Sequence, residues 1–244
     1  MDKVFLIMIV VLLLLLPILK TEAKENNSNS NTSITELDLK SVNSVETSVS
    51  CKIVLKQGKT QIVSIKGQGI EKLNIYVKGK TLYIKKHNES FSLNRFFRSK
   101  TEHFLITICL NEINSISVKG SAAIMNSTPI EGNNLNIRLN GVGAIELTEL
   151  NYNNIDAYLK GTGAIELGGT TNTLNLSLKG VGSIKTENLK AYSCKAFNYG
   201  IGAISLYAEN ELEATLSGVG SIEYYGNPKV IKHINGIGVI EKAN

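Results

Sequence analysis

The chain has 244 residues, 43% of them hydrophobic, which is enough for one large or two small domains with a substantial core. It lacks a long helical periodicity, which argues against a helical fold. Its three cysteines, Cys51, Cys109 and Cys194, are too few and odd in number for a disulfide framework. Cys51 and Cys109 could pair in an oxidising compartment, but we expect buried free thiols.

Residues 1–23 have the pattern of a secretory signal peptide. Lys3 precedes an apolar run over 4–19 that Pro17 interrupts, and a small residue suited to cleavage follows at Ala23. An uncleaved membrane anchor is the alternative, but the run is shorter than the roughly 18–20 residues that a spanning helix needs. We therefore expect export to the periplasm, the outer surface or the extracellular medium.

The net charge of +5 is unevenly distributed. Residues 24–130 hold 15 Lys and Arg against 8 Asp and Glu, or +7, whereas residues 131–244 hold 9 against 11, or −2. A basic half can indicate an anionic partner. Nucleic acid is not expected for an exported protein, and lipid headgroups or acidic glycans fit better. Solubility alone is the simplest explanation.

Residues 24–33 are rich in Asn and Ser and are predicted to form a flexible leader. From residue 34 to 115 the chain alternates apolar and polar residues in short runs, which predicts short strands joined by short turns. The predicted strands cover 45–49, 52–56, 61–66, 73–77, 81–85 and 104–110. Lys78–Lys80 predicts a tight hairpin between two of them.

One basic loop interrupts these strands over 87–103. Its candidate contact residues are Arg95, Phe96, Phe97, Arg98 and Lys100. Loops on a rigid scaffold often carry binding sites, so this loop is a candidate contact site. The alternative, which we prefer, is that one of the two phenylalanines covers an open end of the core.

A Gly-x-Gly repeat dominates residues 116–242 and recurs every 18 to 21 residues, with Gly120-Ser121-Ala122 as a degenerate first copy. Each copy is followed by a small residue and then, in all six, by Ile. The repeated glycines are Gly141, Gly143, Gly161, Gly163, Gly180, Gly182, Gly200, Gly202, Gly218, Gly220, Gly236 and Gly238. A period near 20 residues with strand chemistry and Asn-rich turns, such as 151–154 and 170–172, predicts parallel rungs stacked as a β-helix or β-solenoid.

Alternation along the rungs predicts where each residue points. The glycines share the parity of core residues such as Leu139 and Ile145, so we expect them to form two inward ladders where each rung turns a corner. Asn198 breaks the same inward column and is expected to bond a backbone group. The residues between the glycines form an outward apolar column that we expect to be partly buried: Val142, Thr162, Val181, Ile201, Val219 and Ile237.

Motifs for catalysis, metals or cofactors are not evident. The three histidines lack metal-ligand spacing, and the Gly-x-Gly copies do not open helices, so we expect no cofactor and no metal site. Glu146 and Glu166 could form an acid–base pair of a polysaccharide-active enzyme. A solvated charged ladder is the simpler interpretation, and an enzyme is the minority hypothesis. The charged column comprises Glu146, Glu166, Lys185, Ser205, Glu223 and Glu241.

The Gly-x-Gly-x-Ile rungs and the ending Tyr224–Val230 carry a resemblance to a known family. Together with Val54–Gly58 they resemble the putative auto-transporter adhesin, head GIN domain family of bacterial exported proteins, over roughly residues 37–242. The resemblance implies an all-β solenoid at the cell envelope without established catalytic residues. It favours a non-catalytic binding module, with a glycan or a cell-surface protein as partner. A polysaccharide-active enzyme and a self-associating structural component are the alternatives.

Overall fold

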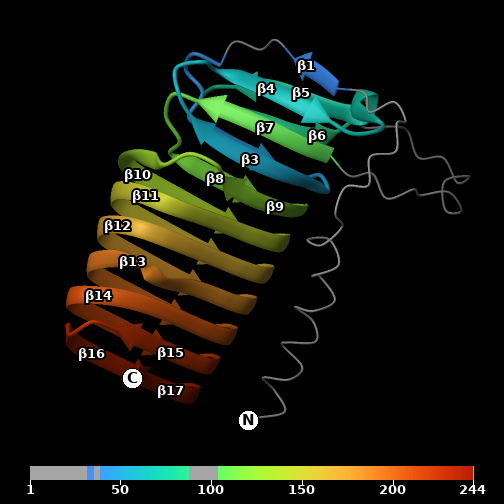
Figure 1. Cartoon of the computed structure of the whole chain (residues 1–244). Coiled ribbons are helices and arrows are strands. Elements are labelled where there is room, and N and C mark those ends of the chain that lie inside the picture. The colour runs from blue at the N-terminus through green and yellow to red at the C-terminus, as the bar shows by residue number, and fades with distance from the viewer. Residues whose placement is uncertain (1–31, 36–38, 88–103, 244) are drawn as a thin grey trace, which may run out of the picture. The chain divides into compact units, whose positions relative to one another are not determined.

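The computed structural model describes residues 32–35, 39–87 and 104–243 and winds them into a β-solenoid (Figure 1). The first strands are β1 (Thr32–Thr35), β2 (Ser44–Thr47), β3 (Cys51–Gln57), β4 (Ile62–Lys66), β5 (Leu73–Lys78), β6 (Thr81–Lys86), β7 (Phe104–Leu110), β8 (Ser115–Val118) and β9 (Ser121–Asn126). The later strands are β10 (Ile130–Leu139), β11 (Val142–Leu159), β12 (Thr162–Leu178), β13 (Val181–Asn198), β14 (Ile201–Leu216), β15 (Val219–Tyr225), β16 (Lys229–Ile234) and β17 (Ile237–Lys242). A 3-10 turn, η2 (Ile70–Lys72), precedes β5. In the part of the chain described, no helix is long and apolar enough to cross a membrane.

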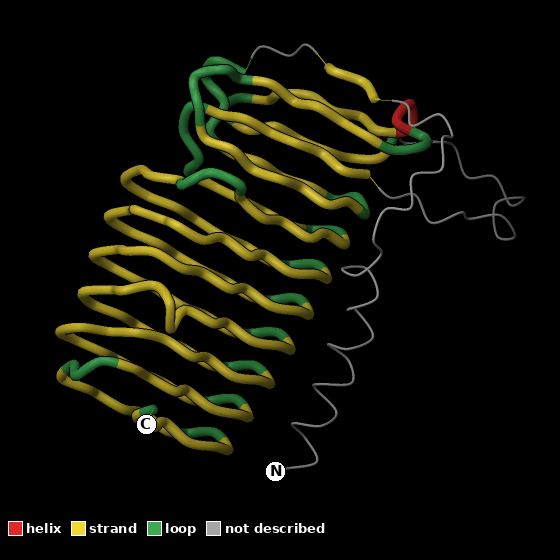
Figure 2. Tube along the Cα trace, in the orientation of Figure 1, coloured by secondary structure: helices red, strands yellow, loops and turns green. Residues whose placement is uncertain are grey.

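Each rung contributes a strand to two opposed faces (Figure 2). The long strands β11 to β14 bend midway, so their first parts pair with first parts and their second parts with second parts. Face A runs in the order β1, β4, β7, β3, β9, the first parts of β11 to β14, β15 and β17. Face B runs β5, β6, β2, β8, β10, the second parts of β11 to β14, and β16. The predicted all-β solenoid with rungs of about 20 residues is therefore confirmed.

The rungs extend into the N-terminal strands, across the expected boundary at residue 116. β8–β9 stack in parallel on β2–β3, and β2–β3 stack in parallel on β6–β7. The order in space thus differs from the order in the chain, because β6–β7 lie outside β2–β3. Only the pairings of β1, β4 and β5 at this end are antiparallel. Thr32 and Ser33, predicted in the flexible leader, instead belong to β1 and pair with β4.

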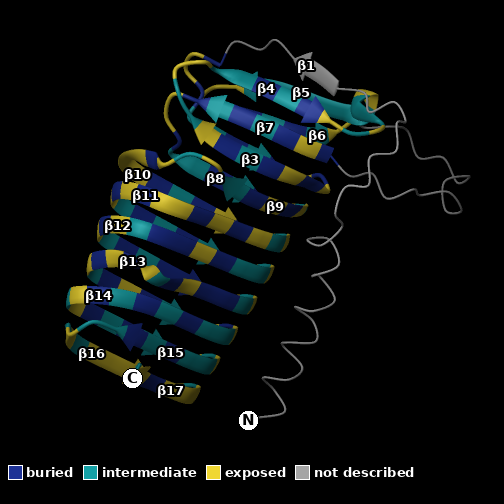
Figure 3. Ribbon diagram, in the orientation of Figure 1, coloured by how far each residue is buried: buried dark blue, intermediate teal, exposed yellow. Residues whose placement is uncertain are grey.

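The core lies between the two faces and follows the predicted alternation (Figure 3). In the rung of β11, Ile145 and Leu147 on face A and Ile155 and Leu159 on face B are completely buried. Burial of each such side chain stabilises the fold by about 1.5–3 kcal/mol. Because a rung has only a thin interior of its own, most of this burial depends on the rungs above and below.

The glycine corners form one long edge of the solenoid, seen as stacked short loops in Figure 2. The second glycines of the six copies pair in register and have φ between 139° and 147°. A Cβ built on Gly163 would lie 1.8 Å from the carbonyl oxygen of Gly143 in the preceding rung. The missing side chain would therefore point along the stack and not into the core, which corrects the expectation of inward glycine ladders.

The column between the glycines is exposed, so the expected partial burial is wrong. The exposed fraction is 49% for Val142, 56% for Ile201 and 73% for Ile237. Asn198 behaves as expected: it is fully buried, its Nδ2 donates to the Gly202 carbonyl at 2.9 Å, and its Oδ1 accepts from the Gly200 N–H at 3.2 Å. It thus satisfies the backbone of one corner from inside the core.

The cysteines are free, and geometry prevents a bond between Cys51 and Cys109. In the parallel pair β3–β7, Cys51 is level with Phe104, whereas Cys109 is level with Lys56. An offset of five residues corresponds to about 16 Å along the strand, well beyond disulfide reach. Burial raises the pKa of the Cys51 thiol and, more strongly, that of Cys194, so both stay protonated and unreactive in the folded chain.

We predict that Gly163→Ala destabilises the chain by about 3 kcal/mol or more, because the methyl group meets a backbone oxygen and φ is positive. In a domain of this size this corresponds to a fall in Tm of about 6–12 °C, measurable by circular dichroism. The matched control is Gly168→Ala in the same strand, where the nearest atoms lie at 3.6–4.0 Å from the added carbon. If both variants lowered Tm by the same amount, the proposed clash between the added methyl group and the carbonyl oxygen of the preceding rung would be wrong.

The C-terminal rung leaves its strands β16 and β17 with an open edge among the described residues. Ile231 and Ile234 are 60% and 49% exposed there. Lys232 is level with the core residue Ala214 and crosses this open end. Its Nζ donates to the Ile240 carbonyl of β17 at 2.9 Å and lies 5.0 Å from the Tyr224 ring centroid. An inward-pointing lysine on an edge strand opposes pairing with another chain.

We expect Lys232→Leu to cause concentration-dependent association, because it replaces the ammonium at the open edge by an apolar side chain. Light scattering coupled to gel filtration would show a larger species than for the unsubstituted chain. Lys229→Leu adds the same side chain to the same strand at an exposed position level with Glu211, so it serves as the control. Identical behaviour of the two variants would exclude a protective role for Lys232.

Candidate functional site

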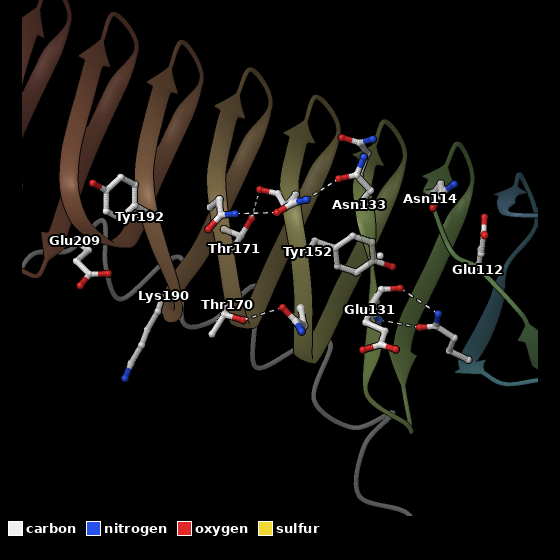
Figure 4. Close-up of a pocket in the computed structure, with 16 residues that line it drawn as sticks. Glu112, Asn114, Glu131, Asn133, Tyr152, Thr170, Thr171, Lys190, Tyr192 and Glu209 are labelled. Atoms are coloured by element: carbon white, nitrogen blue, oxygen red, sulfur yellow. Dashed lines mark hydrogen bonds between the residues drawn. The ribbon is translucent and has the colours of Figure 1, made fainter.

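A polar groove lies on the edge opposite the glycine corners, where face A turns into face B (Figure 4). It has a volume of about 780 Å³ and is the larger of the two cavities that we consider on the described residues. We call it the asparagine groove. Its lining comprises Gln57, Glu112, Asn114, Glu131, Gly132, Asn133, Asn134, Asn151, Tyr152, Asn153, Thr170, Thr171, Asn172, Lys190, Tyr192 and Glu209.

An amide ladder runs along the groove. Asn153 Nδ2 donates to Asn133 Oδ1 at 2.8 Å, and Asn172 Nδ2 donates to Asn153 Oδ1, also at 2.8 Å. The in-register parallel rungs bring these side chains within about 4.8 Å of one another, close enough for each amide to bond the next. The ladder fixes the rotamers of three exposed side chains, so a ligand would not have to order them.

Two shorter polar rows lie beside this ladder. Asn154 Nδ2 donates to Asn134 Oδ1 at 2.9 Å, and Thr170 Oγ1 donates to Asn151 Oδ1 at 3.3 Å. The groove wall is therefore a patterned set of amide and hydroxyl groups whose mutual positions are set by the backbone register. Such a wall can make many hydrogen bonds to a ligand that carries both donors and acceptors.

Tyr152 forms part of the floor. Its side chain is buried, and its Oη donates to the Ile113 carbonyl at 2.6 Å. Gly132 is level with it in β10, and a Cβ on Gly132 would lie 2.7 Å from Tyr152 Cε1, so the glycine makes room for the ring. Burial raises the pKa of the Tyr152 phenol, with further contributions from the Glu112 and Glu131 carboxylates, so the hydroxyl stays neutral.

The ends of the groove carry its charges and its exposed aromatic ring. Glu112 and Glu131 lie at one end, and Lys190, Tyr192 and Glu209 lie at the other (Figure 4). Tyr192 is 54% exposed. The lining thus holds three carboxylates and one ammonium, a net charge of −2 in a chain whose total is +5.

Gln57 ties the acidic end of the groove to the N-terminal rungs. Its Nε2 donates to the Glu131 carbonyl at 3.0 Å and to the Asn111 carbonyl at 3.1 Å, and its Oε1 accepts from the Glu131 N–H at 2.7 Å. One side chain therefore holds three backbone groups from two other segments. This bracing keeps the end of the groove rigid.

A smaller depression of about 220 Å³ lies on the outer side of face B. Lys119 Nζ and Glu46 Oε2 form an ion pair at 2.8 Å there, and this pairing raises the pKa of Lys119. Arg138 also lines it, with its guanidinium 5.5 Å from the Tyr158 ring centroid. Its charged groups are thus already engaged with neighbouring side chains.

The residues singled out from the sequence do not gather at this groove. The candidate contact loop, Arg95, Phe96, Phe97, Arg98 and Lys100, lies outside the described residues. The glycine column forms the opposite edge, and Glu146 and Glu166 stack on the outer side of face A. Across the described ranges, no group of three or more His, Cys, Asp or Glu side chains could hold a metal ion.

Sequence reasoning missed the asparagine groove, although its signal was present. The Asn-rich segments at 151–154 and 170–172 were interpreted as turns. Their recurrence at the rung period, with Asn133 one period earlier, is what builds the ladder.

The profile of the family described as putative auto-transporter adhesin, head GIN domain, matches residues 42–228. The chain belongs to this family. The resemblance inferred from the Gly-x-Gly-x-Ile rungs is confirmed, and the match to the head GIN domain includes every residue that lines the asparagine groove.

Solved structures share the fold of this head GIN domain. A putative adhesin from Bacteroides fragilis is 27% identical, with a TM-score of 0.79 over 89% of this chain and 98% of that one. A putative lipid binding protein from Parabacteroides distasonis (22% identical, TM-score 0.68) and a putative adhesin from Parabacteroides merdae (18%, TM-score 0.62) have the same coverage and show the fold. No curated protein sequence matches the chain.

We predict that Asn153→Asp weakens the ladder in a pH-dependent way. The carboxylate cannot donate to Asn133 Oδ1, and repulsion between the oxygens raises the folded-state pKa of the introduced carboxyl above its usual value of about 3.9. The loss of stability, of order 1 kcal/mol, is therefore full above that raised pKa and disappears as the pH falls below about 3.9.

Thermal melts at pH 7 and pH 3.5 would measure this difference relative to the unsubstituted chain. Asn235→Asp, at an exposed position on the glycine edge, is the control and should show a much smaller pH-dependent difference. A Tm difference for Asn153→Asp that is the same at both pH values would show that the amide donor does not matter.

Proposed function

We propose that this chain is an exported, non-catalytic adhesive module of the bacterial cell envelope that binds a glycan in the asparagine groove. The observation that carries the proposal is the amide ladder of Asn133, Asn153 and Asn172, which presents fixed hydrogen-bonding groups along a solvent-accessible groove. Sugar hydroxyls both donate and accept, so they complement such a wall. Membership of an adhesin family supports binding as the role.

The position of the groove also supports a binding role. It lies where face A turns into face B, on a stack whose rungs are held by parallel ladders on both faces. Binding residues placed on a rigid scaffold keep their geometry before the ligand arrives, which limits the entropic cost of binding. Gln57 and Tyr152 reinforce this rigidity at one end through their bonds to backbone groups.

A lipid ligand is less compatible with this groove. The relative from Parabacteroides distasonis is described as a putative lipid binding protein. The lining of the asparagine groove is mostly amide, hydroxyl and carboxylate groups, whereas pockets for acyl chains are lined by apolar side chains.

A polysaccharide-active enzyme is the second candidate, and Glu112 and Glu131 are the residues that would serve it. Both line the same end of the groove (Figure 4). Two neighbouring carboxyl groups are what glycoside hydrolysis requires. The distant Glu209 cannot take part with them, because β11, β12 and β13 lie between.

We expect the exported chain to bind immobilised glycans and to lose at least about fivefold in affinity when Asn153 and Asn172 are both replaced by alanine. The double substitution removes the central amides of the ladder, and each lost bond to a ligand is worth about 0.5–1.5 kcal/mol. A glycan array followed by isothermal titration calorimetry measures the effect. Asn235→Ala on the glycine edge is the matched control.

Unchanged affinity of the double variant would place the contact site elsewhere and overturn the proposal. Incubation of the same glycans with the chain and assay for new reducing ends addresses the enzyme alternative. Release of reducing sugar that Glu131→Gln abolishes would replace the non-catalytic role by hydrolysis.

A further inference from the structure

The amide ladder is part of a longer row that crosses the whole groove. From the strand registers, Asn172 is level with Tyr192, and Glu209 follows on β14. The row, one residue per rung, is Asn133, Asn153, Asn172, Tyr192 and Glu209, and Glu112 lines the same groove at the Asn133 end. Four rung spacings of about 4.8 Å give the row a length of about 19 Å.

This spacing suits an extended linear polysaccharide. The rise per sugar of an extended β-linked chain is close to one rung spacing, so successive sugars can meet equivalent side chains on successive rungs. A chain that crossed the stack at right angles would meet one rung only and would leave the rest of the row unused.

The bonding capacity left on the central amide, Asn153, favours a hydroxyl ligand. Asn153 has two N–H donors and an oxygen with two lone pairs, and the ladder uses one donor and one lone pair. One donor and one acceptor remain. A sugar hydroxyl can satisfy both, whereas a carboxylate or phosphate can only accept and would face the remaining amide oxygen with its negative charge.

The charges at the groove disfavour an acidic polymer. The carboxylates of Glu112, Glu131 and Glu209 outnumber the single ammonium of Lys190. The basic N-terminal half of the sequence suggested acidic glycans or lipid headgroups, but its excess charge does not lie in this groove. Whole-chain charge is thus a poor guide to this site.

We infer that the asparagine groove binds an extended, uncharged, linear polysaccharide lying parallel to the stack axis, with one sugar at each of Asn133, Asn153 and Asn172 and a sugar ring on Tyr192. This inference rests on the proposed function and names the ligand class of the same site. The half-exposed Tyr192 ring continues the amide row (Figure 4), where a sugar can stack on it. Aromatic rings offer apolar area with little loss of side-chain entropy.

The test is calorimetric titration of the exported chain with neutral β-linked gluco-oligosaccharides of one to six sugars, and with oligogalacturonides as acidic counterparts. We expect affinity to rise with each sugar up to about four and then level off. We also expect the acidic series to bind at least tenfold more weakly. Binding of the neutral series should change less than twofold between 50 mM and 500 mM salt, since no ion pair is formed.

Variants locate the ligand along the row. Tyr192→Ala should lower the affinity for the four-sugar ligand at least tenfold but change that for the disaccharide less than threefold, and Tyr192→Phe should retain both. Tyr199→Ala is the matched control, because Tyr199 is 48% exposed but lies on the glycine edge.

Distinct results separate the inference from the proposed function. If affinity stops rising after two sugars, the axial orientation is wrong. If the acidic series binds more tightly and the Asn153 and Asn172 double variant abolishes that binding, the groove is a glycan site for a charged polymer, so the inference falls and the proposed function stands. If no oligosaccharide responds to the groove variants, both fall.

Discussion

The close stacking of backbone on backbone at the glycine corners is the constraint on which this fold depends. At Gly163 even a methyl group would meet the carbonyl oxygen of the preceding rung, so each corner must repeat the one before it. A repeated corner fixes the register of the strand segments next to it, so that core residues lie on core residues there.

The two long edges of the solenoid use this register differently. The glycine edge keeps strict pairing from rung to rung. The opposite edge contains the register shifts, between Leu147 and Leu150 in β11 and between Thr186 and Lys190 in β13. There side chains such as Asn153 and Gln57 form hydrogen bonds between neighbouring rungs. The candidate site lies on this second edge, where variation in side chains does not disturb the stacking.

Much of the fold could be predicted from local patterns, and the site could not. Alternation located the strands, the hairpin at Gly79 and the buried Asn198, because each depends on neighbouring residues. The direction of the glycine corners was missed, since alternation assumes extended backbone and φ near 143° at Gly163 rotates the missing side chain onto the stack axis. The groove was missed because it appears only when residues about twenty apart are placed side by side.

The position of β6–β7 outside β2–β3 has a consequence for how the chain reaches this structure. From β10 onward each rung pairs with a rung about twenty residues away in the chain. In contrast, β3 pairs with β9, which lies about seventy residues later in the chain. Closing long loops before their contacts form slows folding. We therefore expect folding to start among the C-terminal rungs and to finish with the N-terminal rungs. The N-terminal rungs are thus synthesised first but fold last.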